Sequence, residues 1–374
     1  MPWRYPIFDL DYGEEERRAV IEVIQSGWIT QGPKTLEYEE KLASCFGVKY
    51  ALATSSGTTA LHLAYLAAGI HPGMKVIVPS LTFVATVTPL LWIGARPLFA
   101  DIHSLKYPNI SPESVEKLAP EADAIVFVHY AGFPDFIQDI LEIARKYNLI
   151  LIEDASHAIG TKINGKFAGT FGQVSAFSTF SNKNLSTGEG GFILTNDKKI
   201  FKKAKLLRSH GMTTTSYSKF SGNHPLYDVV EIGFNYRITE IHAALGIVQL
   251  EKLEQKNEKR QELVKKYRNK LKYVEGLIIP FENFENSANY IFPVVMPETT
   301  DREKVIDKMA EAGIQTSIHY PPIHKFTAFL RLFGDIELPI TEEYARRTLT
   351  LPLYPSLNPQ DIAYITDAFK RSIH

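Results

Sequence analysis

The chain has 374 residues with 45% hydrophobic content, which is enough to bury more than one core, so we expect two domains. Its 41 Lys and Arg balance 42 Asp and Glu, and a net charge of -1 leaves no electrostatic footprint for nucleic acid or an anionic membrane surface. Small molecules or other folded proteins are therefore the expected partners.

The single cysteine, Cys45, can form neither an internal disulfide nor a cysteine-based metal site, which fits a reducing compartment. The first residues, MPWRYPIFDLDYGEEE, contain no basic region followed by an apolar stretch. No window approaches about 18 uninterrupted apolar residues, the length of a membrane span. We expect a cytoplasmic protein without a metal site or a membrane segment.

Short apolar runs alternate with helical patterns over the first half of the chain. The expected strands are KYALATSS (49–56), KVIVPSLTF (75–83), ARPLFADI (95–102), AIVFVHYAG (124–132), LILIEDA (149–155), VSAFSTF (174–180) and GFILTND (191–197). The early runs are apolar on both faces and are bounded by Gly, Pro or charge, which predicts a parallel sheet covered by helices.

The pattern changes near residue 235. Residues 238–271 carry apolar residues near helical spacing and become highly charged toward the end, which predicts one long helix leaving the sheet. Beyond it, strand-like runs such as YIFPVVM (290–296) and the helical DREKVIDKMAEAG (301–313) indicate a small mixed domain. We expect a large domain over residues 1–250 and a small C-terminal domain over residues 251–374.

Polar residues follow several of the apolar runs, and in an open parallel sheet ligands collect at the carboxyl ends of the strands. The stretch SSGTT (55–59) lies where a strand turns into a helix. Its free backbone N–H groups and the hydroxyls of Thr58 and Thr59 can face an anion at the positive end of that helix. An ordinary helix cap is the alternative interpretation.

Asp154 ends the run LILIEDA, so its carboxylate starts from a buried strand. A buried carboxylate needs a cation or several hydrogen-bond donors, and it either caps a neighbouring helix or holds a cationic group of a ligand. His157 lies three residues further on, where a satisfied polar residue is the ordinary interpretation.

Lys183 lies between the run that ends at Phe180 and the turn GEGG (188–191). Most lysines extend their amine into solvent. An amine that is desolvated or near other cations has a lowered pKa, and it can attack a carbonyl as a Schiff-base nucleophile. The glycines would let the backbone approach closely around it.

A phosphate cradle, the aromatic Phe83 at a strand end, the buried Asp154 and Lys183 are together the parts that hold pyridoxal phosphate. The motifs occur in the order GTTAL, PSLTFVAT, EDASHAIG, FSTFSNKNLSTGEGG, GFNYRITEIHAALG and HYPPIH. This set resembles the DegT/StrS family of sugar aminotransferases, which has the aspartate-aminotransferase-like type I fold. The resemblance extends from about residue 27 to residue 324. It implies an α/β protein whose large domain has a mostly parallel central sheet flanked by helices, with a small C-terminal α+β domain.

The resemblance also implies roles for the residues around the cofactor. Lys183 would form the Schiff base and then move the proton between substrate carbon and cofactor carbon. Asp154 would pair with the pyridine nitrogen, and His157 would lie near the 3-oxygen of the cofactor. Phe83 would stack on the ring face.

The phosphate of the cofactor would be bound by Thr58 and Thr59 together with Ser178. By the same resemblance, Asn235 would reach the phosphate in a neighbouring subunit, so the expected assembly is a homodimer with shared active sites. One departure is that Thr179 and Phe180 stand where many relatives have Phe and His.

Four residues are expected to contact the substrate. Arg237 could hold a carboxylate or a sugar-nucleotide group in a bidentate manner. His319 and Tyr320 fall where the family places substrate-facing side chains, although a loop stiffened by proline, without a ligand, is the alternative. Thr30, in the TQGP loop, is a further candidate for substrate selection.

The implied activity is transfer of an amino group from an amino acid, by analogy L-glutamate, to a nucleotide-linked keto-sugar in amino-sugar or surface polysaccharide biosynthesis. Two alternatives stay open. A sensor that binds pyridoxal phosphate without turnover would not need a lysine, and the related sugar dehydratases have His at the position of Lys183.

Overall fold

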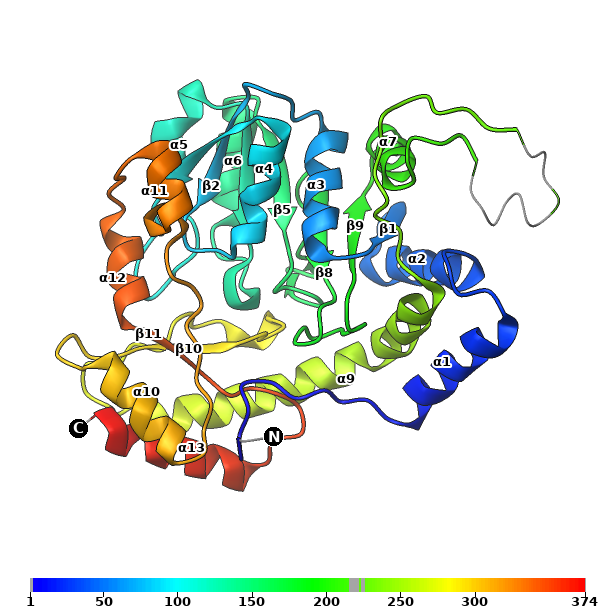
Figure 1. Cartoon of the computed structure of the whole chain (residues 1–374). Coiled ribbons are helices and arrows are strands. Elements are labelled where there is room, and N and C mark those ends of the chain that lie inside the picture. Colours follow the sequence, from blue (N-terminus) through cyan, green and yellow to red (C-terminus); the bar gives the residue numbers. More distant parts are fainter. Residues whose placement is uncertain (1–2, 215–221, 223–225, 374) are drawn as a thin grey trace.

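The computed structural model describes residues 3–214, 222 and 226–373. A seven-stranded sheet with the order β1-β9-β8-β5-β4-β2-β3 forms its centre (Figure 1). The strands are β1 (Tyr50–Thr54), β2 (Lys75–Pro79), β3 (Arg96–Ala100), β4 (Ala124–Val128), β5 (Ile150–Asp154), β8 (Val174–Ser178) and β9 (Gly191–Thr195). Strand β9 runs antiparallel to both of its neighbours, β1 and β8, and all other pairs in this sheet are parallel. The expected mostly parallel α/β sheet is confirmed.

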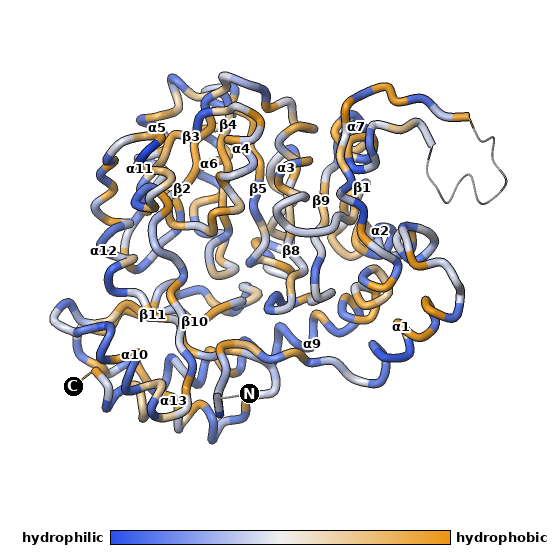
Figure 2. The backbone as a smooth tube through the Cα atoms, in the orientation of Figure 1, coloured by the Kyte–Doolittle hydropathy of each residue, from blue (hydrophilic) through white to orange (hydrophobic). Residues whose placement is uncertain are grey.

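Both faces of the sheet are covered by helices, because successive side chains of each strand point to opposite faces. Val126 and Ile152 pack into a core with α3, α4 and α7, whereas Ile125 and Leu151 pack into another with α5 and α6. These helices are α3 (Gly57–Ala68), α4 (Thr88–Ile93), α5 (Pro112–Leu118), α6 (Ile137–Lys146) and α7 (Lys198–Arg208). Figure 2 shows the strands as largely apolar segments inside this shell. The continuous apolar runs in the sequence thus reflect burial on both faces.

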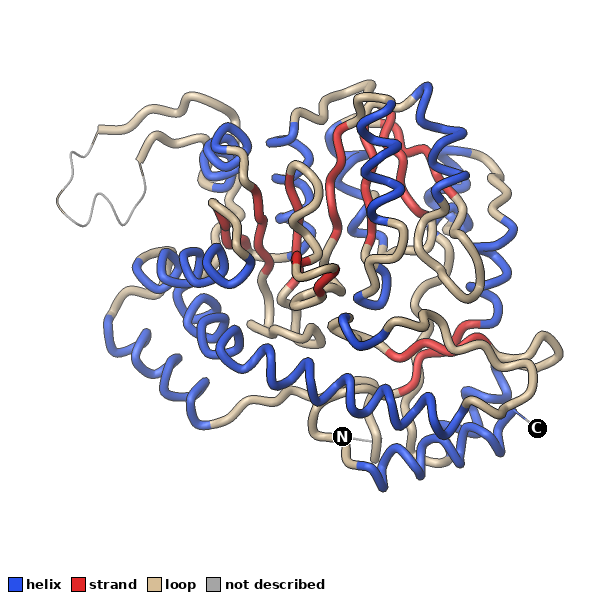
Figure 3. Tube along the Cα trace, turned by 180° about the vertical axis from the view of Figure 1, so that it is seen from behind, coloured by secondary structure: helices blue, strands red, loops and turns tan. Residues whose placement is uncertain are grey.

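The expected long helix is α9 (Glu240–Leu271), which has 32 residues and is therefore about 48 Å long. The Thr239 side chain caps its start by accepting a hydrogen bond from the backbone of His242. The first part of α9 packs with α1 (Glu14–Ser26) and α2 (Pro33–Phe46), and its second part packs with the C-terminal elements. Figure 3 shows α9 crossing below the sheet from one group to the other.

The C-terminal elements surround a small antiparallel sheet of β10 (Phe292–Val295) and β11 (Thr348–Leu351). Helices α10 (Arg302–Glu311) and α13 (Pro359–Ile373) share its core, whereas α11 (Thr327–Phe333) packs through Phe329 against the core of the large sheet. Helix α12 (Pro339–Arg347) leads directly into β11, and a short hairpin of β6 (Lys162–Ile163) and β7 (Lys166–Phe167) follows β5. The expected helix over 301–313 and strand over 290–296 are thus found.

The N-terminal segment joins this C-terminal core, because Tyr5 packs with residues of α9 and α13. The division at residue 250 stays a prediction, and it falls inside the unbroken helix α9. Within the described part of the chain, no helix is both long enough and apolar enough to cross a membrane.

Candidate active site

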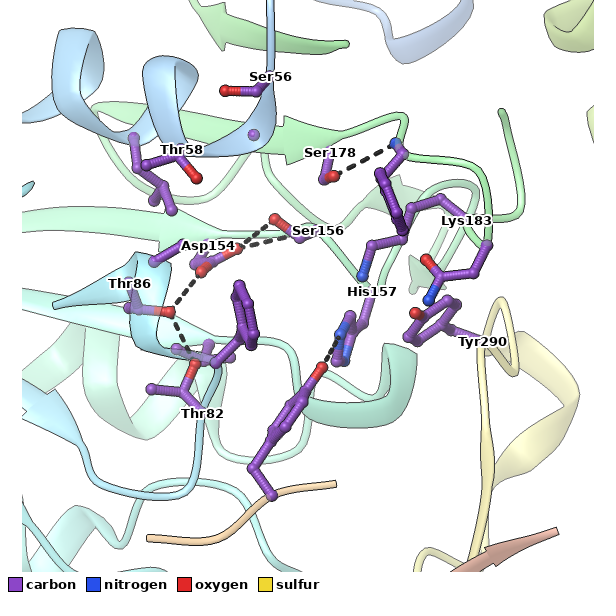
Figure 4. A pocket seen from close by; sticks show the side chains of 18 of the residues that line it. Ser56, Thr58, Thr82, Thr86, Asp154, Ser156, His157, Ser178, Lys183 and Tyr290 are labelled. Atoms are coloured by element: carbon purple, nitrogen blue, oxygen red, sulfur yellow. Dashed lines mark hydrogen bonds between the residues drawn. The ribbon is translucent and has the colours of Figure 1, made fainter. Parts of the chain in front are cut away.

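A pocket of about 360 Å³ lies at the carboxyl ends of β5 and β8, next to the start of α3. Its lining also includes residues that follow β2, the turn after β8, and Tyr290, His319 and Tyr320 from much later in the chain. Figure 4 shows side chains from these separate segments around the pocket. This edge of the sheet is where a parallel α/β fold places ligands.

Asp154 ends β5 and is 5% exposed. One carboxylate oxygen accepts a hydrogen bond from the Thr86 hydroxyl at 2.7 Å, and the other accepts from the Ser156 hydroxyl at 2.6 Å. The Thr86 hydroxyl uses its only proton on Asp154, so Thr82 must donate to Thr86 across their 2.7 Å contact. These hydroxyls orient the carboxylate at the pocket wall (Figure 4).

Lys183 is half-buried, and its Nζ lies 4.1 Å from the centroid of the Tyr290 ring. Burial lowers the pKa of the Lys183 amine to about 7, although the negative charge of Asp154 acts in the opposite direction. A large fraction of this amine is therefore neutral near pH 7. An unprotonated lysine can act as a nucleophile toward a carbonyl and as a base.

The turn that presents Lys183 is closed by backbone hydrogen bonds. The Lys183 N–H donates to the Phe180 carbonyl at 2.8 Å, and the Thr187 N–H donates to the Thr179 carbonyl at 2.8 Å. Gly190 has φ 153°, and a Cβ at this position would lie 2.4 Å from the Thr179 hydroxyl oxygen. Thr179 is therefore a buried element of the turn, whereas Phe180 lines the pocket.

The start of α3 forms another wall of the pocket. Its N-cap is Ser56, whose hydroxyl accepts a hydrogen bond from the Thr59 N–H. The Thr59 hydroxyl donates to the Ser56 carbonyl at 2.9 Å, so it is used within the cap. A Cβ on Gly57 would lie 2.7 Å from the Cβ of Ser178, so only glycine lets α3 approach β8 this closely. This leaves Thr58, Ser178 and backbone N–H groups beside the helix end that attracts anions.

His157 is buried, and its ring lies 4.2 Å from the Tyr290 ring between centroids. Burial lowers the pKa of His157 well below its ordinary value, and the positive charge of Lys183 adds to this. His319 is likewise kept neutral, because burial lowers its pKa to about 3. Tyr320 lies 2.9 Å from His157 between Oη and Nε2.

Most of the residues expected at the site do line this one pocket. They are Thr58, Phe83, Asp154, His157, Ser178, Lys183, His319 and Tyr320. Phe83 is 56% exposed, and its ring centroid lies 5.9 Å from that of Tyr320. The roles of these residues stay predictions.

Four expected residues do not line the pocket of this chain, namely Thr59, Thr30, Asn235 and Arg237. Thr30 and Asn235 are exposed and Arg237 is half-buried. The loop that contains Thr30 is tied to α9, because the Glu240 carboxylate accepts hydrogen bonds from the N–H groups of Gly32 and Thr35.

Sequence reasoning missed Tyr290, Thr86 and Ser156 as parts of this site. Thr86 and Ser156 lie within motifs already quoted for the resemblance, so their closeness to Phe83 and Asp154 was an available signal. Tyr290 begins the apolar run YIFPVVM (290–296), more than a hundred residues after Lys183, and no local pattern connects the two. No cluster of His, Cys, Asp or Glu that could hold a metal ion occurs among the residues described.

Comparison with known proteins identifies the family that the sequence motifs resemble. A family model described as the DegT/DnrJ/EryC1/StrS aminotransferase family matches residues 10–370. The spore coat polysaccharide biosynthesis protein SpsC of Bacillus subtilis is 34% identical, over 99% of this chain and 96% of that protein.

Solved structures agree over nearly the whole chain. PseC of Helicobacter pylori, an aminotransferase involved in the biosynthesis of pseudoaminic acid, superposes with a TM-score of 0.93 at 31% identity, covering 99% of both chains. The PLP form of Spr1654 from Streptococcus pneumoniae, a proposed sugar aminotransferase, gives a TM-score of 0.89 at 25% identity, with 98% of each chain covered.

A sugar dehydratase is also similar, so likeness of fold does not by itself separate the two reactions. A mutant form of GDP-4-keto-6-deoxymannose-3-dehydratase gives a TM-score of 0.91 at 27% identity, covering 98% of this chain and 100% of that one. The family model nevertheless spans almost all of the sequence. On this ground, and with the pocket described above, the chain belongs to the DegT/DnrJ/EryC1/StrS aminotransferase family.

Proposed function

We propose that this protein is a pyridoxal-phosphate-dependent aminotransferase that moves an amino group from an amino acid, L-glutamate, to a nucleotide-linked keto-sugar. The observation that carries the proposal is the half-buried Lys183 amine, with a pKa of about 7, in the same pocket as the buried Asp154 carboxylate. A reactive amine and an oriented carboxylate are the two ionisable groups that this chemistry requires.

The residues present fit pyridoxal phosphate. The Asp154 carboxylate, which accepts bonds from Thr86 and Ser156, would hold the proton of the pyridine nitrogen. The phosphate would lie at the start of α3, beside Thr58 and Ser178, where helix N–H groups favour an anion. Phe83 would offer its ring for stacking.

The pocket residues also account for proton movement. Bound pyridoxal phosphate supplies an electron sink that acidifies the C–H bond of an attached amine. With the cofactor bound, Lys183 would be the group that holds and returns a proton at Nζ, because an amine with a pKa of about 7 can do both near neutral pH. The Asp154 carboxylate would hold the proton of the ring nitrogen.

The names of the similar proteins support a sugar as the acceptor, because SpsC is named for polysaccharide biosynthesis and PseC for pseudoaminic acid biosynthesis. We further propose a homodimer with shared active sites, with Asn235 reaching the phosphate in the partner. The exposure of Asn235 and its absence from the pocket of its own chain support this arrangement.

The absorbance spectrum of the purified protein with pyridoxal phosphate tests the proposal. We expect a visible band of lysine-bound cofactor, its loss on addition of L-glutamate with release of 2-oxoglutarate, and its return with a nucleotide-linked keto-sugar. A band that L-glutamate leaves unchanged would favour a sensor without turnover. Release of the sugar's hydroxyl as water, without transfer of nitrogen, would favour the dehydratase.

A further inference from the structure

The Tyr320 hydroxyl and the His157 ring form a hydrogen-bonded pair at the pocket wall. Tyr320 Oη lies 2.9 Å from His157 Nε2, and the backbone N–H of Ala131 donates to the other ring nitrogen, Nδ1, at 3.3 Å. In Figure 4 a dashed line joins His157 to a hydroxyl on the side of the pocket away from α3.

These contacts determine which atom carries each proton. A neutral imidazole has one donor and one acceptor nitrogen, and a backbone N–H can only donate, so Nδ1 is the acceptor. The proton of His157 is therefore on Nε2, and Tyr320 Oη accepts it. The hydroxyl proton of Tyr320 remains available, since no other hydrogen bond joins this hydroxyl to a described residue.

The main chain around Tyr320 is fixed on both sides. The Tyr130 hydroxyl donates to the carbonyl of His319, and the Ile323 N–H donates to the Ser80 carbonyl at 3.1 Å. A donor that is held in place before the ligand arrives loses little entropy on binding. Tyr320 is thus a preorganised hydrogen-bond donor in the same pocket as Lys183.

The charge of the surrounding wall indicates which kind of oxygen this donor suits. Among the described residues that line the pocket, Lys183 is the only lysine or arginine. His157 and His319 are neutral because burial lowers their pKa, and burial raises the pKa of Tyr320. A carboxylate would be desolvated here without a cation of its own, whereas a hydroxyl or keto oxygen would not carry that penalty.

We propose that His157 is a positioning residue that fixes the Tyr320 hydroxyl as a hydrogen-bond donor to an uncharged oxygen of the acceptor sugar. This inference rests on the proposed function and deepens it. His157 would act through Tyr320, because its Nε2–H is used on that hydroxyl in the ligand-free protein. Its expected position near the 3-oxygen of the cofactor stays a prediction.

The first test needs neither cofactor nor substrate. In the ligand-free wild-type protein labelled with ¹⁵N, the side-chain nitrogen signals of His157, assigned by comparison with His157→Gln, are expected to show a protonated Nε2 and an unprotonated Nδ1. A protonated Nδ1 would overturn the inference, whatever the enzyme catalyses.

The second test separates the two half-reactions, with L-glutamate as donor and a panel of UDP- and dTDP-linked 4-keto-6-deoxyhexoses as acceptors. Tyr320→Phe is expected to lower kcat/KM for the accepted sugar about tenfold, the effect of one hydrogen bond, with a smaller loss for L-glutamate. His157→Leu should match this loss, while His157→Gln should retain more activity because its amide N–H can still donate to Tyr320. The double variant Tyr320→Phe/His157→Leu should be no worse than Tyr320→Phe alone.

Additive losses in the double variant, or equal losses in both half-reactions, would contradict the inference. Failure of the wild-type protein to transfer nitrogen to any sugar in the panel would instead count against the proposed function. The ¹⁵N measurement would then still report on the His157–Tyr320 pair.

Discussion

Glu153 and Asp154 are consecutive carboxylates at the end of β5, yet they lie on opposite faces of the sheet and in very different surroundings. Glu153 is fully buried and accepts hydrogen bonds from the backbone N–H groups of Gly169, Phe171 and Gly172, and it contacts His129 Nε2 at 2.7 Å. Asp154 faces the pocket and is held by the hydroxyls of two side chains.

This difference in partners leaves only Asp154 open to a ligand. Burial alone would raise the pKa of Glu153, but the bonds from His129 and the backbone outweigh it and keep the pKa below its ordinary value. Glu153 has no capacity left for a ligand, because its oxygens are surrounded by fixed donors. Asp154 lies at the edge of a cavity, where its negative charge raises the pKa of Lys183.

The largest expected effect concerns the amine on the pocket side. Replacement of Lys183 by Ala removes both the nucleophile and the base, so transamination should fall by at least about 10³-fold. Steady-state rates and the absorbance of lysine-bound cofactor would measure this. Lys202→Ala, an exposed change on α7, is the matched control and should behave like the wild type. Comparable rates in the two variants would remove Lys183 from the mechanism.

A loss of about 10²-fold to 10³-fold in kcat is expected for Asp154→Asn, because an amide cannot keep the ring nitrogen protonated. The Asp154→Asn and Glu153→Gln variants should be compared by kcat per folded molecule, with folding checked by circular dichroism. If Glu153→Gln lost as much activity as Asp154→Asn, the assignment of a structural role to Glu153 and a ligand-binding role to Asp154 would be wrong.

Glu153→Gln should instead reduce stability. The NH₂ group of the new glutamine would face N–H groups that donate to the carboxylate in the wild type. This clash of donors should lower the free energy of unfolding by about 3 kcal/mol. Urea denaturation of the purified variants gives this number. A Glu153→Gln protein as stable as the wild type would show that the turn at 169–172 does not depend on this carboxylate.

A smaller effect is expected from pH. Since the Lys183 amine has a pKa of about 7, the neutral fraction and the rate of covalent cofactor binding should rise about tenfold per pH unit below pH 7 and level off above it. Asp154 raises this pKa, so Asp154→Asn should move the rise to lower pH, whereas Glu153→Gln should leave it in place. A rise centred near the ordinary lysine pKa would mean that the amine is solvated.

Much of the sheet could be derived from local patterns in the sequence. Strand runs, their burial on both faces and the long helix after residue 238 follow from periodicity, which depends only on neighbouring residues. Asp154, Ser178 and Lys183 were identified because they lie at or just beyond the ends of such runs, and parallel strands bring their carboxyl ends to one edge. Even so, alternation along β5 did not by itself tell which of Glu153 and Asp154 would face the pocket.

Only the tertiary structure brought Tyr290 under Lys183 and turned Tyr320 toward His157. These contacts join residues more than a hundred positions apart, and they depend on how α9 and the C-terminal elements pack against the sheet. Backbone geometry also decided the partner of the Thr59 hydroxyl, which donates within the cap of α3. The sequence alone did not distinguish this use from the expected phosphate contact. The sequence by itself therefore determined the strands and the position of Lys183 after one of them, because these are local properties, while long-range packing decided the burial of its amine and the walls of the pocket.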